Sequence, residues 1–275
     1  MSHSPGSEAV VDTDPVLSSP KRPKITVSGV TKYYGRHNEV RALHDVDLVI
    51  NEGEFVCLVG PSGCGKSTLL RMFADLHHPS AGTVEIERTS SGHTAAMVFQ
   101  NYSIFPWKTV AENITLPLQV NGTPKAEREA RALALMERMG LEEFANARPA
   151  ALSGGMAQRV SIARALAVQP EILLMDEPFA ALDAQMRRVL QDELLSIWQE
   201  DQRTVVFVTH SLEEAILLGD RVVVMSARPG RIISDHHVPF ERPRRPELRG
   251  TKEFAELEQK IWAEMRIEVE RSEDQ

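Results

Sequence analysis

The sequence is poor in cysteine and has no long apolar run. Its 275 residues contain only two cysteines, Cys57 and Cys64. They form neither a disulfide framework nor a Cys-x-x-Cys motif, so a reducing, cytosolic compartment is expected. No run approaches the ~18 apolar residues that a membrane-spanning helix needs. The segment Met1–Pro20 lacks a basic region followed by an apolar stretch, so no secretory signal is expected.

An excess of basic residues is also missing. The chain has 31 Lys and Arg against 39 Asp and Glu, a formal net charge of −8. Nonspecific nucleic-acid binding needs a basic surface, and none stands out, so no nucleic-acid partner is expected. The hydrophobic content of 42% and the charged content of 25% are ordinary for a globular protein whose core needs no disulfides.

Changes in composition predict three parts. Residues 1–22 are rich in Ser, Pro and Asp and predict a disordered tail. Residues 23–245 predict one domain, and residues 246–275 a C-terminal helix and tail. The helix is expected over Lys252–Val269, with one apolar face made of Phe254, Leu257, Ile261, Trp262 and Met265.

Strand-like and helical segments alternate within the predicted domain. Strands are expected at Ala42–Ile50, Glu54–Val59, Thr83–Glu87, Ala95–Phe99, Ile172–Met175, Val205–Val208 and Arg221–Met225. Helices are expected at Ser67–Leu76, Ala126–Met139, Asp183–Trp198 and Ser211–Leu218. This alternation predicts an α/β fold with a parallel sheet, and residues from about 101 to 167 read as an inserted helical subdomain.

The clearest motif is Gly60-Pro61-Ser62-Gly63-Cys64-Gly65-Lys66-Ser67, which fits G-x-x-x-x-G-K-[ST] between a predicted strand and a predicted helix. In such a loop, backbone N–H groups and the helix N-terminus hold the phosphates of ATP. Lys66 is expected to reach the β- and γ-phosphates, Ser67 to offer its hydroxyl to Mg²⁺, and Thr68 to add a donor. Cys64 lies close to the helix start, so we expect a lowered thiol pKa and a reactive thiol that nucleotide shields. An unreactive small side chain is the alternative.

Two carboxylates follow a predicted buried strand. Asp176 and Glu177 come directly after Ile172–Met175, at the end of the strand where open α/β sheets bind their ligands. Asp176 is expected to hold Mg²⁺, usually through water, and Glu177 to polarise the attacking water as a general base. The alternative is a pair of solvated acids.

A second glycine-rich helix start is Leu152-Ser153-Gly154-Gly155-Met156-Ala157-Gln158. Ser153, Gly154 and Gly155 predict another anion-binding terminus. A single chain that binds one nucleotide does not need two phosphate-binding helix starts. Two chains that face each other do, because each could bind the phosphates from one side. On these motifs the sequence resembles the ABC ATPases, over about residues 25 to 240, and Leu152–Gln158 matches their signature.

The resemblance implies a fold and a set of roles. It implies a P-loop NTPase (RecA-like) core with a mostly parallel sheet, an antiparallel β subdomain and an inserted α-helical subdomain. ATP and Mg²⁺ are the implied cofactors. Tyr34 resembles the aromatic residue that stacks on adenine, with Tyr33 as a competitor. Gln100 resembles the switch glutamine that senses Mg²⁺ and the attacking water, His210 the histidine at the γ-phosphate, and Asp183 part of the loop that crosses a dimer interface. The other eight histidines, including the pair His236 and His237, are expected in loops.

The resemblance also implies partners. They are a second copy of this chain, permease subunits that hold it at the cytoplasmic side of the membrane, and indirectly a solute-binding protein. Phe105 and Trp107 are expected at the permease contact, and a locally buried loop is the alternative. Segments Phe179–Arg187, Ser226–Arg231 and Pro239–Arg244 are most similar to nitrate, sulfonate and taurine importers. Importers of pyrimidine precursors and other small solutes, an exporter subunit and a cluster-assembly ATPase remain alternatives.

Two other classes are disfavoured. Translation-type ABC ATPases carry two cassettes, whereas this chain has one phosphate loop and one signature. The DNA-maintenance type needs room for a long coiled coil, and only about fifty residues separate Gln100 from the signature.

Overall fold

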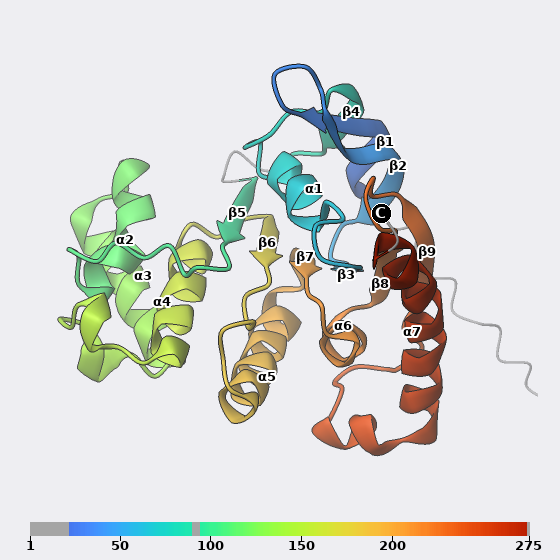
Figure 1. Cartoon of the computed structure of the whole chain (residues 1–275). Coiled ribbons are helices and arrows are strands. Elements are labelled where there is room, and N and C mark those ends of the chain that lie inside the picture. Colours follow the sequence, from blue (N-terminus) through green and yellow to red (C-terminus); the bar gives the residue numbers. More distant parts are fainter. Residues whose placement is uncertain (1–21, 90–93, 274–275) are drawn as a thin grey trace, which may run out of the picture.

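The computed structural model describes residues 22–89 and 94–273. The predicted tail therefore lies outside the described residues except for Arg22. Figure 1 shows a central sheet with the helices α2 (Val110–Val120), α3 (Lys125–Arg138) and α4 (Gly154–Ala167) gathered on one side and the long helix α7 (Lys252–Glu273) on the other. No helix in this part of the chain combines the length and the apolar character that a membrane span requires.

The central sheet has six strands in the order β5-β6-β7-β3-β8-β9. Its parallel strands are β3 (Phe55–Val59), β5 (Ala95–Val98), β6 (Ile172–Asp176), β7 (Thr204–Val208) and β8 (Arg221–Met225), and β9 (Ile232–His237) is antiparallel to β8. Every residue of β3, β6 and β7 is buried, as continuous apolar runs predict for strands covered on both faces.

A smaller antiparallel sheet lies beside the first. Its order is β2-β1-β4, with β1 at Pro23–Tyr34, β2 at Val40–Asn51 and β4 at Ala81–Ile86. Alternating side chains of β3 divide the core between the two layers. Val56 and Leu58 pack with the small sheet and α1 (Lys66–Phe73), while Phe55 and Cys57 pack with the remaining helices. The predicted α/β fold with a mostly parallel sheet and an antiparallel β part is confirmed.

Residues 101–167 contain α2, α3, α4 and two short 3-10 turns, η1 (Glu142–Phe144) and η2 (Pro149–Ala151). Helix α2 begins with a capping box in which Thr109 and Glu112 bond each other's backbone N–H groups. Apolar side chains of these helices join the main core. The exact limits of a helical subdomain stay a prediction.

The second half of the chain adds two helices between the strands, α5 (Ala184–Asp201) and α6 (Leu212–Leu218). After β9 follow a 3-10 turn, η3 (Pro246–Gly250), and the final helix α7. On α7, Phe254, Ile261 and Met265 are buried as expected, but Trp262 is 51% exposed. Trp262 therefore does not share the buried side of the predicted apolar face, because it follows Ile261 directly and is turned about 100° from it. The predicted loop position was also wrong for His44, which lies in β2, and for His236 and His237, which lie in β9.

Candidate nucleotide site

The phosphate loop connects β3 to α1. Gly60, Gly63 and Gly65 have positive φ angles of 153°, 75° and 102°, and residues that carry a Cβ rarely adopt such angles. A Cβ on Gly60 would lie 2.6 Å from the carbonyl oxygen of Met225, so glycine is also required by space. Lys66 Nζ donates to the carbonyl oxygens of Gly60 (2.8 Å) and Pro61 (2.9 Å). The loop therefore curls around its own lysine, as the motif predicts.

Ser67 and Asp176 meet at the base of this loop. The Ser67 hydroxyl donates to Asp176 Oδ1 at 2.6 Å, and Asp176 is 3% exposed. A hydroxyl and a carboxylate side by side are the hard oxygen ligands that Mg²⁺ prefers. Two of the three residues predicted for the metal, Ser67 and Asp176, thus fit the ion, although they are 109 positions apart in the sequence. The third, Gln100, bonds to Glu177 instead of to this pair.

Three residues predicted to be catalytic converge next to this pair. Gln100 Nε2 donates to Glu177 Oε2 at 3.4 Å, and His210 Nδ1 lies 3.6 Å from the same oxygen. Glu177 has a left-handed backbone (φ 46°), and its N–H donates to Val208 O at 3.0 Å. This turn aims the carboxylate away from the strand end and toward the other two side chains. Gln100, Glu177 and His210 come from the ends of β5, β6 and β7.

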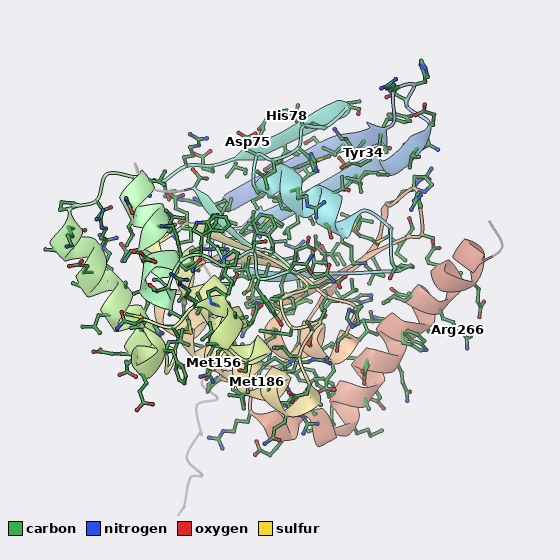
Figure 2. All side chains as sticks on the ribbon, turned by 60° about the vertical axis from the view of Figure 1, so that its left-hand side comes forward. Tyr34, Asp75, His78, Met156, Met186 and Arg266 are labelled. Carbon is green, nitrogen blue, oxygen red and sulfur yellow. The ribbon has the colours of Figure 1, made fainter. Side chains whose placement is uncertain are left out.

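Gln100 and Glu177 line a pocket of about 430 Å³ together with the phosphate loop, whereas His210 reaches Glu177 from outside this lining. Tyr34 lines it and Tyr33 does not, so the predicted preference for Tyr34 agrees with its position. The Tyr34 hydroxyl donates to Thr68 Oγ1 at 3.4 Å. Figure 2 shows Tyr34 on the small sheet beside α1. The complete lining is Tyr34, Val40, Ala42, Ser62, Gly63, Gly65, Lys66, Ser67, Thr68, Gln100, Glu177 and Arg228.

Cys64 does not behave as predicted. Its side chain is 0% exposed and packs into the core beneath the loop. Burial raises the pKa of the Cys64 thiol, and the nearby charge of Lys66 opposes this only in part. The expectation of a lowered pKa and a reactive thiol was wrong, because the side chain is fully buried, even though Lys66 Nζ lies 3.7 Å from its sulfur.

The signature residues lie outside this pocket. Ser153 caps α4 by accepting from the Met156 N–H at 3.3 Å, and Ser153 and Gly154 are exposed. Asp183 is likewise exposed and caps α5 by accepting from the Met186 N–H at 2.9 Å. A Cβ on Gly155 would lie 2.7 Å from Met186 Cγ, so the two helix starts are in contact. Figure 2 labels Met156 and Met186 at this place.

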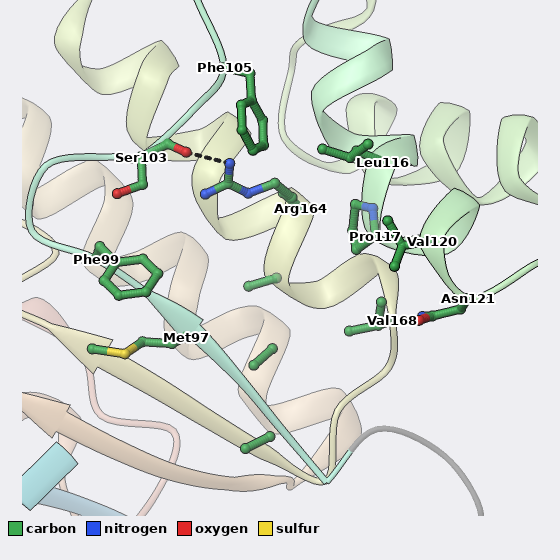
Figure 3. Close-up of a pocket in the computed structure, with 13 residues that line it drawn as sticks. Met97, Phe99, Ser103, Phe105, Leu116, Pro117, Val120, Asn121, Arg164 and Val168 are labelled. Atoms are coloured by element: carbon green, nitrogen blue, oxygen red, sulfur yellow. Dashed lines mark hydrogen bonds between the residues drawn. The ribbon is translucent and has the colours of Figure 1, made fainter. Parts of the chain in front are cut away.

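A second, apolar pocket of about 530 Å³ lies between β5, α2 and α4 (Figure 3). Phe105 lines it, and the Trp107 ring lies 5.4 Å from the Phe105 ring between centroids, tilted by 55°, while Trp107 remains 67% exposed. The alternative of a locally buried loop was therefore wrong for Trp107. Arg164 donates to the carbonyl oxygens of Ser103 (2.6 Å) and Tyr102 (3.1 Å), two residues with left-handed φ angles of 52° and 46°.

Arg228 was missed as a pocket residue by the sequence reasoning. It lies in the segment Ser226–Arg231, which had been singled out only for similarity. No motif of the chain contains it, so only the three-dimensional arrangement places it at the pocket.

Comparisons with known proteins identify the family of the chain. The family model for ABC transporters matches residues 43–180. An uncharacterised ABC transporter ATP-binding protein of Methanocaldococcus jannaschii is 49% identical over 90% of this chain and 94% of its own length. The taurine import ATP-binding protein TauB of Rhizobium johnstonii is 46% identical over 84% of this chain and 90% of its own length. A dimeric ATP-binding cassette in a post-hydrolysis state bound to ADP and Pi superposes with a TM-score of 0.69 at 36% identity, covering 79% of this chain and 100% of that one. The chain belongs to the ABC transporter family.

Proposed function

We propose that this chain is the ATP-binding and ATP-hydrolysing subunit of an ABC importer, which energises the uptake of a small solute through a separate permease. The observation that carries the proposal is that Gln100 and Glu177 line one pocket with the phosphate loop, while His210 contacts the same Glu177 oxygen as Gln100. Family membership and import ATP-binding relatives support the transport role.

Hydrolysis follows from the geometry of these residues. The N–H groups of the phosphate loop, Lys66 and the α1 N-terminus hold the β- and γ-phosphates. Glu177 accepts a proton from the attacking water, and Gln100 and His210 orient water and carboxylate through the contacts already described. The mechanism is mainly positioning and charge stabilisation of an in-line attack. Mg²⁺, held by Ser67 and Asp176, would neutralise charge on the phosphate oxygens.

A second copy of the chain would complete the site. Ser153, Gly154 and Gly155 are predicted phosphate contacts, yet they line no part of the pocket in their own chain. We infer that they bind the γ-phosphate of ATP held by the partner, with Asp183 at the same interface. Closure then requires ATP, and loss of the γ-phosphate removes the bridging contacts and reopens the dimer.

The apolar pocket beside α2 is the proposed permease contact. An exposed tryptophan next to a half-buried Phe105 is a typical anchor for a partner helix. Taurine, nitrate, sulfonate or a similar small solute fits the relatives and the resembling segments, and a solute-binding protein would deliver it. Because the solute would pass through the permease and not through this subunit, its identity rests on similarity.

The experiment is reconstitution of the complete transporter in vesicles, with ATP hydrolysis and solute uptake measured together. Trp107→Ala should leave the ATPase rate of the isolated chain unchanged and reduce both uptake and solute-stimulated hydrolysis at least about tenfold, as loss of an interface anchor does. The control is Leu133→Ala, because Leu133 is also exposed on the helical part but belongs to α3, which contributes no residue to the pocket, whereas Trp107 contacts the pocket residue Phe105. Failure of the chain to associate with a permease would contradict the transport role.

A further inference from the structure

The loop between β8 and β9 is built directly against the phosphate loop. A Cβ on Gly230 would lie 1.9 Å from the carbonyl oxygen of Cys64. The Gly230 N–H donates to Ala42 O at 2.9 Å, and Gly230 O accepts from the His44 N–H at 3.0 Å. The residues 226–231 are thus wedged between the small sheet and the phosphate loop, in contact with both.

The same loop is fixed by bonds of its own. Ser226 Oγ donates to Ala227 O (2.9 Å) and lies within bonding distance of Pro229 O (3.1 Å), and it accepts from the Arg231 N–H at 2.9 Å. From α7, the Glu268 carboxylate accepts from the Ala227 N–H at 3.2 Å. A segment held at these points keeps the backbone of Arg228 in one place relative to the nucleotide pocket.

Arg228 is the residue that this loop presents to the pocket. It lines the cavity together with Ser62, Gly63 and Lys66. Its Nε donates to Gly63 O at 3.5 Å, and a terminal guanidinium nitrogen lies 3.1 Å from where a Cβ on Gly63 would be. In the part of the chain that the structure describes, no Asp or Glu forms an ion pair with Arg228. Its positive charge is therefore not neutralised by an ion pair within residues 22–89 and 94–273.

We propose that Arg228 binds the phosphate chain of the nucleotide from outside the phosphate-loop motif, as a positioning and affinity residue. The proposal rests on the nucleotide site proposed above. A guanidinium suits this role because its planar fork donates two parallel hydrogen bonds to phosphate oxygens. Gly63, the residue it touches, belongs to the loop that surrounds those phosphates. A purely structural role, in which Arg228 only supports the Gly63 carbonyl, makes different predictions.

The test is equilibrium binding of fluorescently labelled ATP, ADP and AMP to the full chain and its variants, at low and high salt. Arg228→Ala should weaken ATP and ADP binding about five- to tenfold, as expected for one charge-assisted contact at a solvent-exposed position. AMP binding should change much less. Because screening weakens charge pairs, the difference from the parent chain should shrink at high salt.

Two more variants separate the effect of the Arg228 charge from the effect of its hydrogen bond to the Gly63 carbonyl. Arg228→Lys keeps the charge and should recover part of the affinity. Arg228→Gln keeps a donor for Gly63 O but no charge, and should bind as weakly as Arg228→Ala. The matched control is Arg231→Ala, another exposed arginine of the same loop that does not line the pocket, and it should bind as the parent does.

Full recovery by Arg228→Gln, an equal loss for AMP and ATP, or unchanged binding by Arg228→Ala would each overturn the proposal. Lys66→Ala reports on the underlying site independently. If Lys66→Ala bound ATP as the parent chain does, the nucleotide site itself would be refuted. If Lys66→Ala lost ATP binding and Arg228→Ala kept it, only the role of Arg228 would be refuted.

Discussion

Gly230 offers a direct test of how the phosphate loop is supported. In Gly230→Ala, the new Cβ would stand 1.9 Å from Cys64 O, and contacts under 3.0 Å essentially do not occur for real Cβ atoms. One of the two backbone segments must therefore move by about 1 Å. The obstacle is a backbone carbonyl, so no side-chain rotation can relieve it.

The cost follows from this displacement. Overpacking of this kind destabilises the folded state by about 1–3 kcal/mol. Alanine also lowers the conformational entropy of the unfolded chain, which offsets about 0.4–1 kcal/mol of this loss. We expect a loss of about 1–2 kcal/mol in the free energy of unfolding, measured by urea denaturation. A loop displaced by about 1 Å no longer aligns its N–H donors with the phosphates, so ATP affinity should fall at least about tenfold.

The control is Gly250→Ala, because nothing lies within 4 Å of a Cβ there. It should retain the stability and the ATP affinity of the parent chain. If Gly230→Ala matched Gly250→Ala in both measurements, the loop of residues 226–231 would not support the phosphate loop, and the reasoning would be refuted.

Three further perturbations follow from the structure. Burial alone would raise the pKa of Glu54, but hydrogen bonds from Asn51 and Arg221 hold that pKa below 4.5. The ionised Glu54 therefore stabilises the folded chain above pH 4.5, and this stabilisation is lost as the pH falls through the lowered pKa. Glu54→Gln should therefore cost about 2 kcal/mol in urea denaturation at pH 7 and less near pH 3, and a constant difference would contradict this. Cys57 and Cys64 are both 0% exposed with thiol pKa values raised by burial. At pH 8 a disulfide reagent should modify them at least about 100-fold faster after unfolding, and one rapidly titrating thiol in the native chain would restore the reactive-cysteine idea. Arg164→Ala should lower the free energy of unfolding by about 2 kcal/mol, because the Ser103 carbonyl loses a charged donor, and full rescue by Arg164→Lys would argue against the forked contact.

The sequence predicted those parts of the fold that depend on local pattern. The buried strands β3, β6 and β7 were predicted within one residue of their observed ends, since their apolar runs are continuous. The strand β9 was missed because Ile232–His237 has two apolar residues followed by four polar ones, so its sequence shows neither a continuous apolar run nor an apolar–polar alternation. Motifs such as the phosphate loop were found because their spacing reflects one local backbone conformation.

Features that depend on packing between distant segments could not be predicted. The direction of the Cys64 side chain is decided by the core beneath the loop, and the helix-start argument considered only the loop itself. Arg228 reaches the pocket because β8 and β9 place their connection against the phosphate loop, 165 positions from Gly63. Such contacts leave no periodicity or spacing in the sequence.

The central claim is that ATP is held between two copies of the chain, by Gly60–Thr68 of one and Ser153–Gly155 of the other. The most direct measurement is sedimentation velocity of Glu177→Gln, which should bind ATP and barely hydrolyse it. With Mg²⁺ and ATP this variant should sediment as a dimer, and with ADP as a monomer. A variant that binds ATP and yet remains monomeric at every protein concentration would contradict the account.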